Sequence, residues 1–381
     1  MTKIKTNRNN TNNVPHLRFP EFSGEWEKNN LSKFSSKITK KNKGNVIQNV
    51  LCNSANLGII PQNDYFDRDI ANADNTDSYY IIEHGDFVYN PRKSTAAPYG
   101  PVNIYNGEKP GIISPLYLCF SVLNISPSFL FYRFKSSVWH PYVYSHGDTG
   151  VRFDRVSIKD DVFFDMPIYT PTQNEQEKIA TLLSLIDERI ATQNKIIEKL
   201  ETLIKALSHK LTTQQRPNTR LKDCLTYHSS ALLESDVKGI GQYPVYGATG
   251  ICGYMDKYEI SGDSILIIKD GASVGSTAYA TGKYSTIGTL NYLRATQECY
   301  LLPYIYYSLK AFDFRPYITG MAIPHIYFKD YSKAKIWCPA VAEQKRIATT
   351  LRTMDTKLQI EHKILRNLIL QKQYLLSNLF I

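Results

Sequence analysis

The fold of this chain is decided by two stretches: residues 171–211, PTQNEQEKIATLLSLIDERIATQNKIIEKLETLIKALSHKL, and residues 339–379, PAVAEQKRIATTLRTMDTKLQIEHKILRNLILQKQYLLSNL. A shift of 168 residues superimposes their identical positions. These are Pro171 and Pro339, Glu175-Gln176 and Glu343-Gln344, Ile179-Ala180 and Ile347-Ala348, and Asp187 and Asp355. So many identities in one register indicate an internal duplication.

Both stretches predict long amphipathic helices, because apolar residues recur at alternating steps of three and four and neither helix contains Gly or an internal Pro. The first seam is Leu183, Ile186, Ile190, Gln193, Ile197, Leu200, Ile204, Leu207 and Leu211; the second is Leu351, Met354, Leu358, Glu361, Leu365, Leu368, Lys372, Leu375 and Leu379. Each helix of about 38 residues would be ~57 Å long. One polar residue, Gln193 or Glu361, stands at the middle of each seam. In an antiparallel coiled coil these two would face each other and help to fix its register; the alternative is that each side chain reaches solvent.

The segments before the helices are also similar. Residues 80–90 and 258–268 both predict an aliphatic strand, a Gly-Asp turn and a second strand. Residues 111–122 and 285–296 predict strands, and residues 126–137 and 301–312 predict short aromatic helices with Pro in the first turn. The order is globular unit, long helix, globular unit, long helix. We therefore expect an α+β fold with two similar mixed α/β domains, separated by an antiparallel helix pair with pseudo-two-fold symmetry.

The expected boundaries follow from this duplication. They are a flexible basic and Asn-rich tail (1–13), a first domain (14–170), a first spacer helix (171–211), a linker (212–220), a second domain (221–338) and a second spacer helix (339–381).

Composition is that of a globular protein of 381 residues, 43% of them hydrophobic, with a net charge of +10. The excess lies mainly in residues 1–48, which hold ten Lys and Arg against three acids, whereas residues 49–170 are net acidic. Basic character favours an anionic partner. Because the charge is unevenly distributed, the surface that binds this partner would be assembled from separate patches of the chain. No stretch of 18 apolar residues is present, so we expect a soluble cytoplasmic protein without a membrane association. The six widely spaced cysteines predict reduced, mostly buried thiols and no zinc site.

The sequence segments that come nearest to catalytic motifs lack essential residues. Asn90-Pro91-Arg92-Lys93 lacks the second Pro and the aromatic of an adenine methyltransferase loop, and residues 271–276, GASVGS, lack the lysine of a nucleotide-binding loop. Glu175 and Glu177 open a helix, where acids complement the dipole. We therefore expect no catalytic residue, no metal ligand and no cofactor on this chain.

Two similar heads at a fixed separation suit the reading of two half-sites on duplex DNA, and because the heads differ in sequence, the half-sites should differ too. Candidate DNA contacts are basic and polar residues in loops that follow the duplicated strands: Lys40, Lys41, Lys43, Arg92, Lys93, Ser94 and Arg152 in the first domain, and Lys269, Ser273, Thr319 and His325 in the second. Arg suits bidentate reading of guanine, and Lys suits phosphate. Candidate register or partner-interface residues are Ile186, Ile190, Gln193, Ile197, Leu358, Glu361 and Leu365. For each residue the alternative is an exposed loop charge or an ordinary seam contact.

The layout resembles the specificity (S, HsdS) subunit of type I restriction-modification enzymes. The resemblance is carried by the duplicated Pro-x-x-x-Glu-Gln-x-x-Ile-Ala helix starts, the opening HLRFPEFSGEWEKNNLSKF (16–34) and the two Gly-Asp strands, and covers nearly the whole chain from Val14. It implies two target-recognition domains that each bind half of a split double-stranded DNA sequence, and helices that set the gap. It also implies two adenine-N6 methyltransferase (modification) subunits, which use S-adenosylmethionine, and motor-nuclease (restriction) subunits, which use ATP and Mg. Two other readings stay open: a stand-alone metal-dependent nuclease with a diverged site, and a coiled-coil assembly protein.

Overall fold

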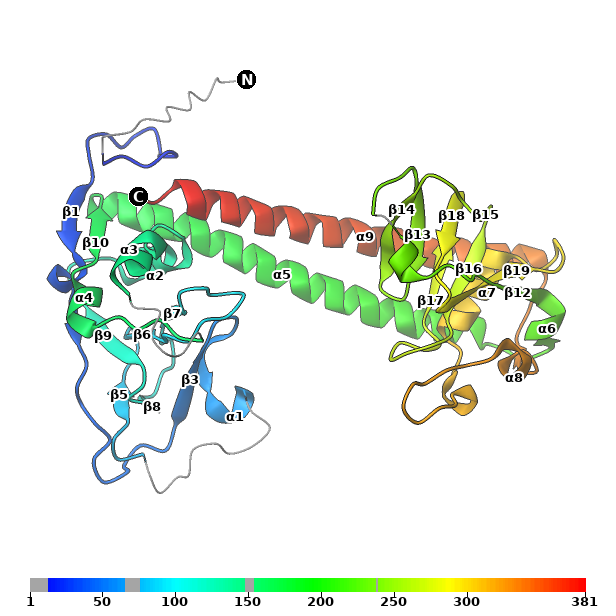
Figure 1. Cartoon of the computed structure of the whole chain (residues 1–381), viewed down its shortest axis with the longest axis horizontal. Coiled ribbons are helices and arrows are strands. Elements are labelled where there is room, and N and C mark those ends of the chain that lie inside the picture. The colour runs from blue at the N-terminus through cyan, green and yellow to red at the C-terminus, as the bar shows by residue number, and fades with distance from the viewer. Residues whose placement is uncertain (1–12, 66–75, 148–153, 238) are drawn as a thin grey trace. The chain divides into compact units, whose positions relative to one another are not determined.

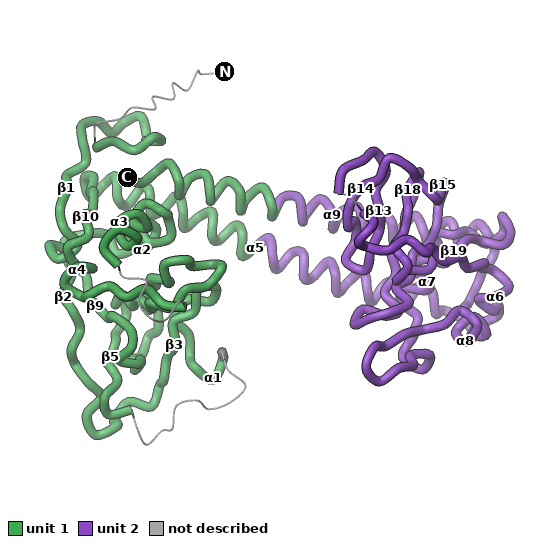
Figure 2. Tube along the Cα trace, viewed as in Figure 1, with its two compact units in different colours: residues 1–192, 365–381 green, residues 193–364 purple. Residues whose placement is uncertain are grey.

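The structure, a computed structural model, describes residues 13–65, 76–147, 154–237 and 239–381. It consists of two compact units (Figure 2): unit 1 comprises residues 1–192 and 365–381, and unit 2 comprises residues 193–364. Each unit holds one globular body and a part of both long helices. The predicted tail, residues 1–13, lies outside the described residues except for Asn13.

The long helices are α5 (Gln173–Thr212) and α9 (Val341–Asn378), of 40 and 38 residues (Figure 1). All the predicted seam residues are buried or half-buried. In unit 1, Leu183 and Ile186 near the start of α5 share a core with Leu375 and Leu379 near the end of α9. The two helices therefore run antiparallel, as the fold class predicted.

Unit 1 contains two four-stranded sheets and one strand pair. The first sheet has the order β2 (Ser35–Lys37), β9 (Leu118–Val122), β6 (Phe87–Tyr89), β7 (Val102–Ile104); the second has β4 (Gly58–Pro61), β3 (Val50–Ser54), β8 (Gly111–Ile113), β5 (Tyr80–Ile82). The pair is β1 (Glu27–Asn30) with β10 (Pro167–Thr170). The short helices are η1 (Leu31–Lys33), α1 (Gln62–Tyr65), α2 (Pro127–Lys135), α3 (His140–His146) and α4 (Asp160–Phe164).

Unit 2 repeats this plan strand for strand. Its sheets are β12 (Leu225–Ser229), β19 (Leu290–Ala295), β16 (Ser264–Ile268), β17 (Thr277–Ala280), and β14 (Gly250–Met255), β13 (Tyr243–Gly247), β18 (Lys283–Thr286), β15 (Ile260–Ser261). The pair is β11 (Thr219–Arg220) with β20 (Lys335–Ile336), so the last two residues of the predicted linker form a strand. The short helices are α6 (Leu221–Cys224), η3 (Glu234–Asp236), α7 (Leu302–Lys310), η4 (Arg315–Tyr317) and α8 (Phe328–Tyr331).

The matching of the two units extends to strand direction. In each unit one pair of strands in the second sheet is parallel, β3 with β8 and β13 with β18, while the other pairs are antiparallel. The Gly-Asp turns lie where the sequence predicted them, between β5 and β6 and between β15 and β16. Gly85 and Gly262 have φ of 89° and 96°, which glycine adopts at little cost.

The repeated Glu-Gln explains how each long helix is fixed to its globular body. In unit 1, Gln176 Oε1 accepts from the Ser126 N–H (2.9 Å), and Nε2 donates to the Pro171 carbonyl (3.0 Å). In unit 2, Gln344 Oε1 accepts from the Leu301 N–H (2.9 Å), and Nε2 donates to the carbonyls of Cys299 and Pro339. Each glutamine thus joins the first turn of the long helix to the start of the aromatic helix.

The repeated Asp forms a second duplicated contact. Tyr132 donates to Asp187 (3.0 Å) in unit 1, and Tyr307 donates to Asp355 (2.9 Å) in unit 2. Burial and the neighbouring carboxylate raise the pKa of both tyrosines, so the hydroxyls remain donors.

Residues 16–22, part of the opening segment that resembles the family, bind both long helices within unit 1. Leu17 N–H donates to the Asn378 carbonyl (2.9 Å) near the end of α9. Arg18 makes a bidentate pair with the buried Glu175 (2.8 Å for both bonds), and Lys178 lies over the Phe19 ring. Glu343, the repeat counterpart of Glu175, instead pairs with Arg346 on its own exposed helix face.

Two further expectations concern thiols and membranes. Cys52, Cys119 and Cys224 are buried, Cys252 and Cys338 are half-buried, and Cys299 is exposed, and all six are free thiols. Within the described ranges, no helix combines the length and the apolar character needed to cross a bilayer.

Candidate nucleic-acid interface

Each unit presents one pair of loops built in the same way. Loop pair 1, in unit 1, consists of residues 90–101, which follow β6, and residues 154–156, which precede α4. Lys93 N–H donates to the Asp154 carbonyl (2.8 Å), and Val156 N–H donates to the Pro91 carbonyl (2.9 Å). Gly100 has φ of 83°, and a Cβ there would lie 2.1 Å from the Asn90 carbonyl oxygen, so the loop closes on itself only with glycine.

Loop pair 2, in unit 2, consists of residues 269–276, which follow β16, and residues 319–326, which precede α8. Ile326 N–H donates to the Lys269 carbonyl and Gly271 N–H to the Pro324 carbonyl, both at 2.9 Å. Thr319 and His325 exchange two backbone hydrogen bonds (2.9 and 2.8 Å), which closes the second loop as a tight hairpin. Backbone bonding of this kind gives both loop pairs a defined shape rather than leaving them as free connections.

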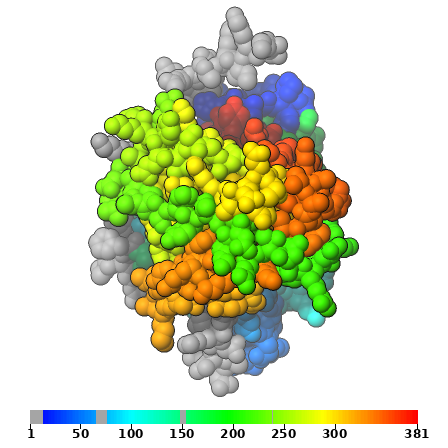
Figure 3. Space-filling model, turned by 90° about the vertical axis from the view of Figure 1, so that its right-hand side faces the viewer, coloured from blue at the N-terminus to red at the C-terminus, as the bar shows by residue number. Residues whose placement is uncertain are grey.

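Unit 2 is seen face-on in Figure 3, where orange residues of the segment that precedes α9 lie beside green residues that follow α5. The contact is made by Leu221 N–H, which donates to the Ala334 carbonyl (2.9 Å), and by Lys222 N–H, which donates to the Ser332 carbonyl (2.9 Å). The residues directly after α8 are therefore hydrogen-bonded to α6, and the residues before α8 belong to loop pair 2.

The structure brings most of the predicted DNA contacts onto these loops. Arg92, Lys93 and Ser94 lie on loop pair 1, and Lys269, Ser273, Thr319 and His325 lie on loop pair 2. Arg92 and Ser94 are exposed, and Lys93 is half-buried. The Arg92 Nε lies 3.9 Å from Asp154, a loose exposed ion pair that leaves the guanidinium available.

The other predicted contacts of the first domain lie elsewhere. Lys40, Lys41 and Lys43 are on the β2–β3 connection, which hydrogen-bonds to the neighbourhood of β5 through Lys40 O and Tyr79 O. Lys40 also pairs loosely with Glu83 at 3.8 Å. Arg152 lies outside the described residues.

Sequence reasoning missed two features of the loop pairs. Arg155 forms a β-bridge with Arg92, as His325 does with Asp270 in unit 2. Aligning the segments before α4 and α8 would have revealed this correspondence. The second missed feature is a pair of apolar side chains in loop pair 2, Met321 and Ile323, which are 106% and 65% exposed. They lie between a Gly and a Pro in the sequence.

Gln193 and Glu361 lie together in unit 2. Gln193 Nε2 donates to the Glu361 carboxylate (2.6 Å) and to its backbone carbonyl (3.1 Å). Their facing position agrees with the antiparallel pairing, and a role in fixing the register stays a prediction.

The other predicted interface residues lie in the helix seam. Ile186 and Ile197 are buried, and Ile190, Leu358 and Leu365 are half-buried. Ile186 and Ile197 therefore pack within the chain, whereas the half-buried side chains keep part of their surface exposed, and a role of these residues in a partner interface stays a prediction. The large apolar side chains that the long helices leave exposed are Leu185, Ile196, Leu203, Val341, Ile360, Ile364, Ile369, Leu370 and Tyr374.

Among the described residues, no three His, Cys, Asp or Glu side chains lie close enough together to hold a metal ion.

The comparison with protein families assigns the class of the second unit. Residues 218–369 match the family described as "Type I restriction modification DNA specificity domain". This match spans all the strands of unit 2 and the greater part of α9. The globular body of unit 2 is therefore similar to a DNA specificity domain, and unit 1 has the same strand order.

The similarity to known proteins extends over most of the chain. A protein of Mycoplasma genitalium named as a type I specificity subunit is 23% identical over 339 residues, which cover 83% of this chain and 86% of the relative. The crystal structure of a type I restriction-modification S subunit from M. genitalium has the same fold, with a TM-score of 0.63, 18% identity and coverage of 97% of this chain and 99% of that chain.

A second solved structure comes from work on complex assembly and conformational transition of the type I restriction-modification system, with a TM-score of 0.57, 15% identity and coverage of 92% and 96%. The chain is therefore similar over most of its length to specificity subunits of type I restriction-modification systems.

Proposed function

We propose that this chain recognises an asymmetric, bipartite sequence in duplex DNA, with one half-site bound by each unit. The observation that carries the proposal is the duplicated loop pair with different side chains at matching places. The bridge that pairs Arg92 with Arg155 in unit 1 pairs Asp270 with His325 in unit 2. One scaffold with two sets of polar groups suits the reading of two different half-sites.

The side chains of the loop pairs have distinct roles in this proposal. Arg92 and Arg155 suit bidentate hydrogen bonds to guanine, and Asp270 suits the amino group of cytosine. Lys93 and Lys269 are half-buried at the loop bases and suit phosphates. The net charge of +10 supports attraction to DNA that weakens with salt.

The long helices serve as the spacer in this proposal. A helix of 40 residues is ~60 Å long at ~1.5 Å per residue, which exceeds one turn of B-DNA at ~34 Å. The gap between half-sites would follow from helix length, while the identity of each half-site would follow from the loops.

The proposal includes scaffolding of two adenine-N6 methyltransferase subunits and, with them, restriction subunits. The exposed apolar residues of α5 support it: Leu185, Ile196 and Leu203 are 11 and 7 residues apart, a spacing that keeps them on one stripe of a helix. In this assembly the chain itself is non-catalytic. S-adenosylmethionine belongs to the methyltransferase, and ATP and Mg belong to the restriction subunits.

The test is co-expression with the cognate methyltransferase, followed by methylome sequencing of the host. We expect one methylated motif with two unlike half-sites. Replacing residues 1–170 with those of a related chain should change one half-site and preserve the other. A change in both, or a motif without a gap, would contradict the proposal.

Two biochemical measurements separate the alternatives. Fluorescence anisotropy with random duplexes at rising salt, with and without the methyltransferase, should show salt-sensitive binding; its absence in both cases favours an assembly protein. Purified chain alone should leave plasmid intact in Mg²⁺, and cleavage by the lone chain favours a nuclease.

A further inference from the structure

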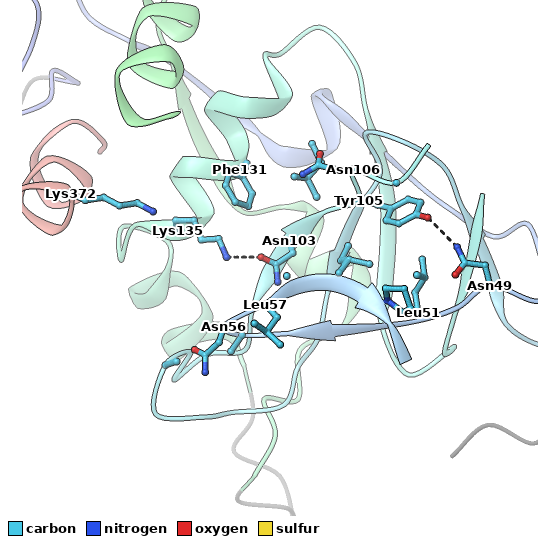
Figure 4. Close-up of a pocket in the computed structure, with 17 residues that line it drawn as sticks. Asn49, Leu51, Asn56, Leu57, Asn103, Tyr105, Asn106, Phe131, Lys135 and Lys372 are labelled. Carbon is cyan, nitrogen blue, oxygen red and sulfur yellow. Dashed lines mark hydrogen bonds between the residues drawn. The ribbon is translucent and has the colours of Figure 1, made fainter. Parts of the chain in front are cut away.

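A polar cavity of about 810 Å³ lies in unit 1, between the turn that joins β3 to β4, strand β7, helix α2 and helix α9 (Figure 4). The polar side chains of its wall are Asn49, Asn56, Asn103, Asn106, Lys135 and Lys372. The described residues that line it include no Asp or Glu. Its size is within the ~300–1,000 Å³ that is usual for small-molecule sites.

The duplication shows that Lys135 is placed differently from its counterpart. The last residue of α7 in unit 2, Lys310, bonds to Asp355 (3.3 Å). Lys135, the last residue of α2, has no such bond to Asp187, because Lys372 of α9 occupies that carboxylate at 2.5 Å. Lys135 instead donates to Asn103 Oδ1 (2.5 Å), at the wall of the cavity (Figure 4).

Asn103 is fixed in the orientation that this bond requires. Its Nδ2 donates to Asn53 Oδ1 (2.6 Å) and to the Ser54 carbonyl (2.9 Å), so its own Oδ1 faces Lys135. An amide oxygen does not neutralise an ammonium group, and no carboxylate of the described residues forms an ion pair with Lys135. The ammonium keeps two further N–H donors for a ligand.

The electrostatic environment of the Lys135 ammonium group favours the binding of an anion. Burial and repulsion from Lys372 lower the pKa of Lys135 to about 8, and the attraction of Asp187 offsets only part of this effect; the residue remains largely protonated at neutral pH. An anion in the cavity would bind Lys135 with charge-assisted hydrogen bonds, which are about twice as strong as neutral ones.

We propose that this cavity binds a phosphate group, with Lys135 as the principal cation, Lys372 at its edge and the side-chain amides of Asn56 and Asn106 as further donors. The group belongs either to a free mononucleotide or to the backbone of bound DNA. Phe131 and Tyr105 line the same space and offer aromatic surface to a base.

The first arm of the test uses AMP as the probe and the full chain, measured by isothermal titration calorimetry. For a free mononucleotide we expect binding that weakens at least tenfold in Lys135→Met and stays within threefold in Lys135→Arg, which keeps the charge. Lys310→Met is the matched control and should leave the affinity unchanged. Adenosine, which lacks the phosphate, should bind at least tenfold more weakly.

A second measurement needs no variant. Lys135 of the unmodified chain should react with an acetylating reagent, and AMP or duplex DNA should protect it, as read by mass spectrometry. This keeps the result interpretable even where a substitution disturbs folding.

The second arm tests the DNA source. If the phosphate is that of DNA, Lys135→Met should weaken binding of all duplexes alike and reduce the slope of log affinity against log salt by about 1, with Lys310→Met again as control.

The inference is overturned if neither AMP nor duplex DNA protects Lys135 and neither affinity changes in Lys135→Met. It fails separately from the proposed function. Binding of AMP without binding of DNA retains the site and rejects the DNA-recognition role. Base-specific DNA binding that is unaffected by Lys135→Met, together with no binding of AMP, rejects the site and retains the DNA-recognition role.

Discussion

Gln176 offers a quantitative test of how the long helix is fixed to unit 1. The side chain is 4% exposed, and both of its hydrogen bonds, to the Ser126 N–H and the Pro171 carbonyl, are buried. Gln176→Ala removes both partners and leaves two backbone groups without a bond. Because each unsatisfied buried group costs ~1–3 kcal/mol, we expect the free energy of unfolding of unit 1 to fall by about 3 kcal/mol.

The control is Gln173→Ala. Among the described residues, the Gln173 side chain bonds only to the Glu177 side chain, on the exposed surface of the same helix, so its removal should cost less than ~0.5 kcal/mol. Gln344→Ala is the matched variant in unit 2. It breaks three bonds in a partly buried setting, where water can replace part of the loss, so we expect about 2 kcal/mol.

Urea unfolding followed by tryptophan fluorescence can assign each loss to a unit. The three tryptophans are divided between the units: Trp26 and Trp139 are buried in unit 1, and Trp337 is buried in unit 2. In a Trp337→Phe background, the fluorescence reports unit 1 alone. Gln176→Ala should lower the midpoint of that transition. If its loss does not exceed that of Gln173→Ala, the role assigned to the repeated glutamine is refuted.

Three further outcomes are expected. Arg92→Ala should weaken binding by roughly 1 to 3 kcal/mol at one base position only, measured on single-substitution duplexes, whereas an equal loss on every duplex would indicate a phosphate contact. Gly100→Ala should lower the free energy of unfolding by more than Gly85→Ala, because both have positive φ but only Gly100 meets a backbone oxygen at 2.1 Å; equal losses in urea unfolding would contradict the close approach. Replacing both Gln193 and Glu361 with Leu should raise the thermal midpoint of the helices in circular dichroism, since a polar pair in a seam favours one register at a cost in stability, and a lower midpoint would contradict that role.

The long helices and the strands that flank the Gly-Asp turns were predictable because their signals are local. The seam repeats every three or four residues, and the Gly-Asp turn lies directly between two strands. The partition of each unit into two sheets was not predictable, since it depends on pairings such as β3 with β8, which lie about 60 residues apart in the sequence. Residue patterns within one segment carry no information about such a partner.

The candidate interface was predictable only in part, for the same reason. The residues after β6 and β16 were identified from the duplication, and the structure places them on loops. Thr319 and His325 on the partner loop of unit 2 were identified too, but the contacts between the loops were not, because a backbone bond from Lys93 to Asp154 leaves no pattern in either segment. Arg155 was overlooked since nothing local distinguishes it from an exposed loop charge.

The division of the chain into units has a consequence for biosynthesis. Unit 2 is one continuous stretch, residues 193–364, and contains all the strands of its sheets. Unit 1 also needs residues 365–381: Leu375, Leu379 and Phe380 belong to its core, and the Phe380 ring lies 5.4 Å from that of Phe129. On the ribosome, most of unit 1 emerges first, but its core lacks Leu375, Leu379 and Phe380 until unit 2 has been synthesised. During this period the apolar surface that these residues cover is exposed, which favours aggregation. The part of the chain that is synthesised first is therefore the last to be completed.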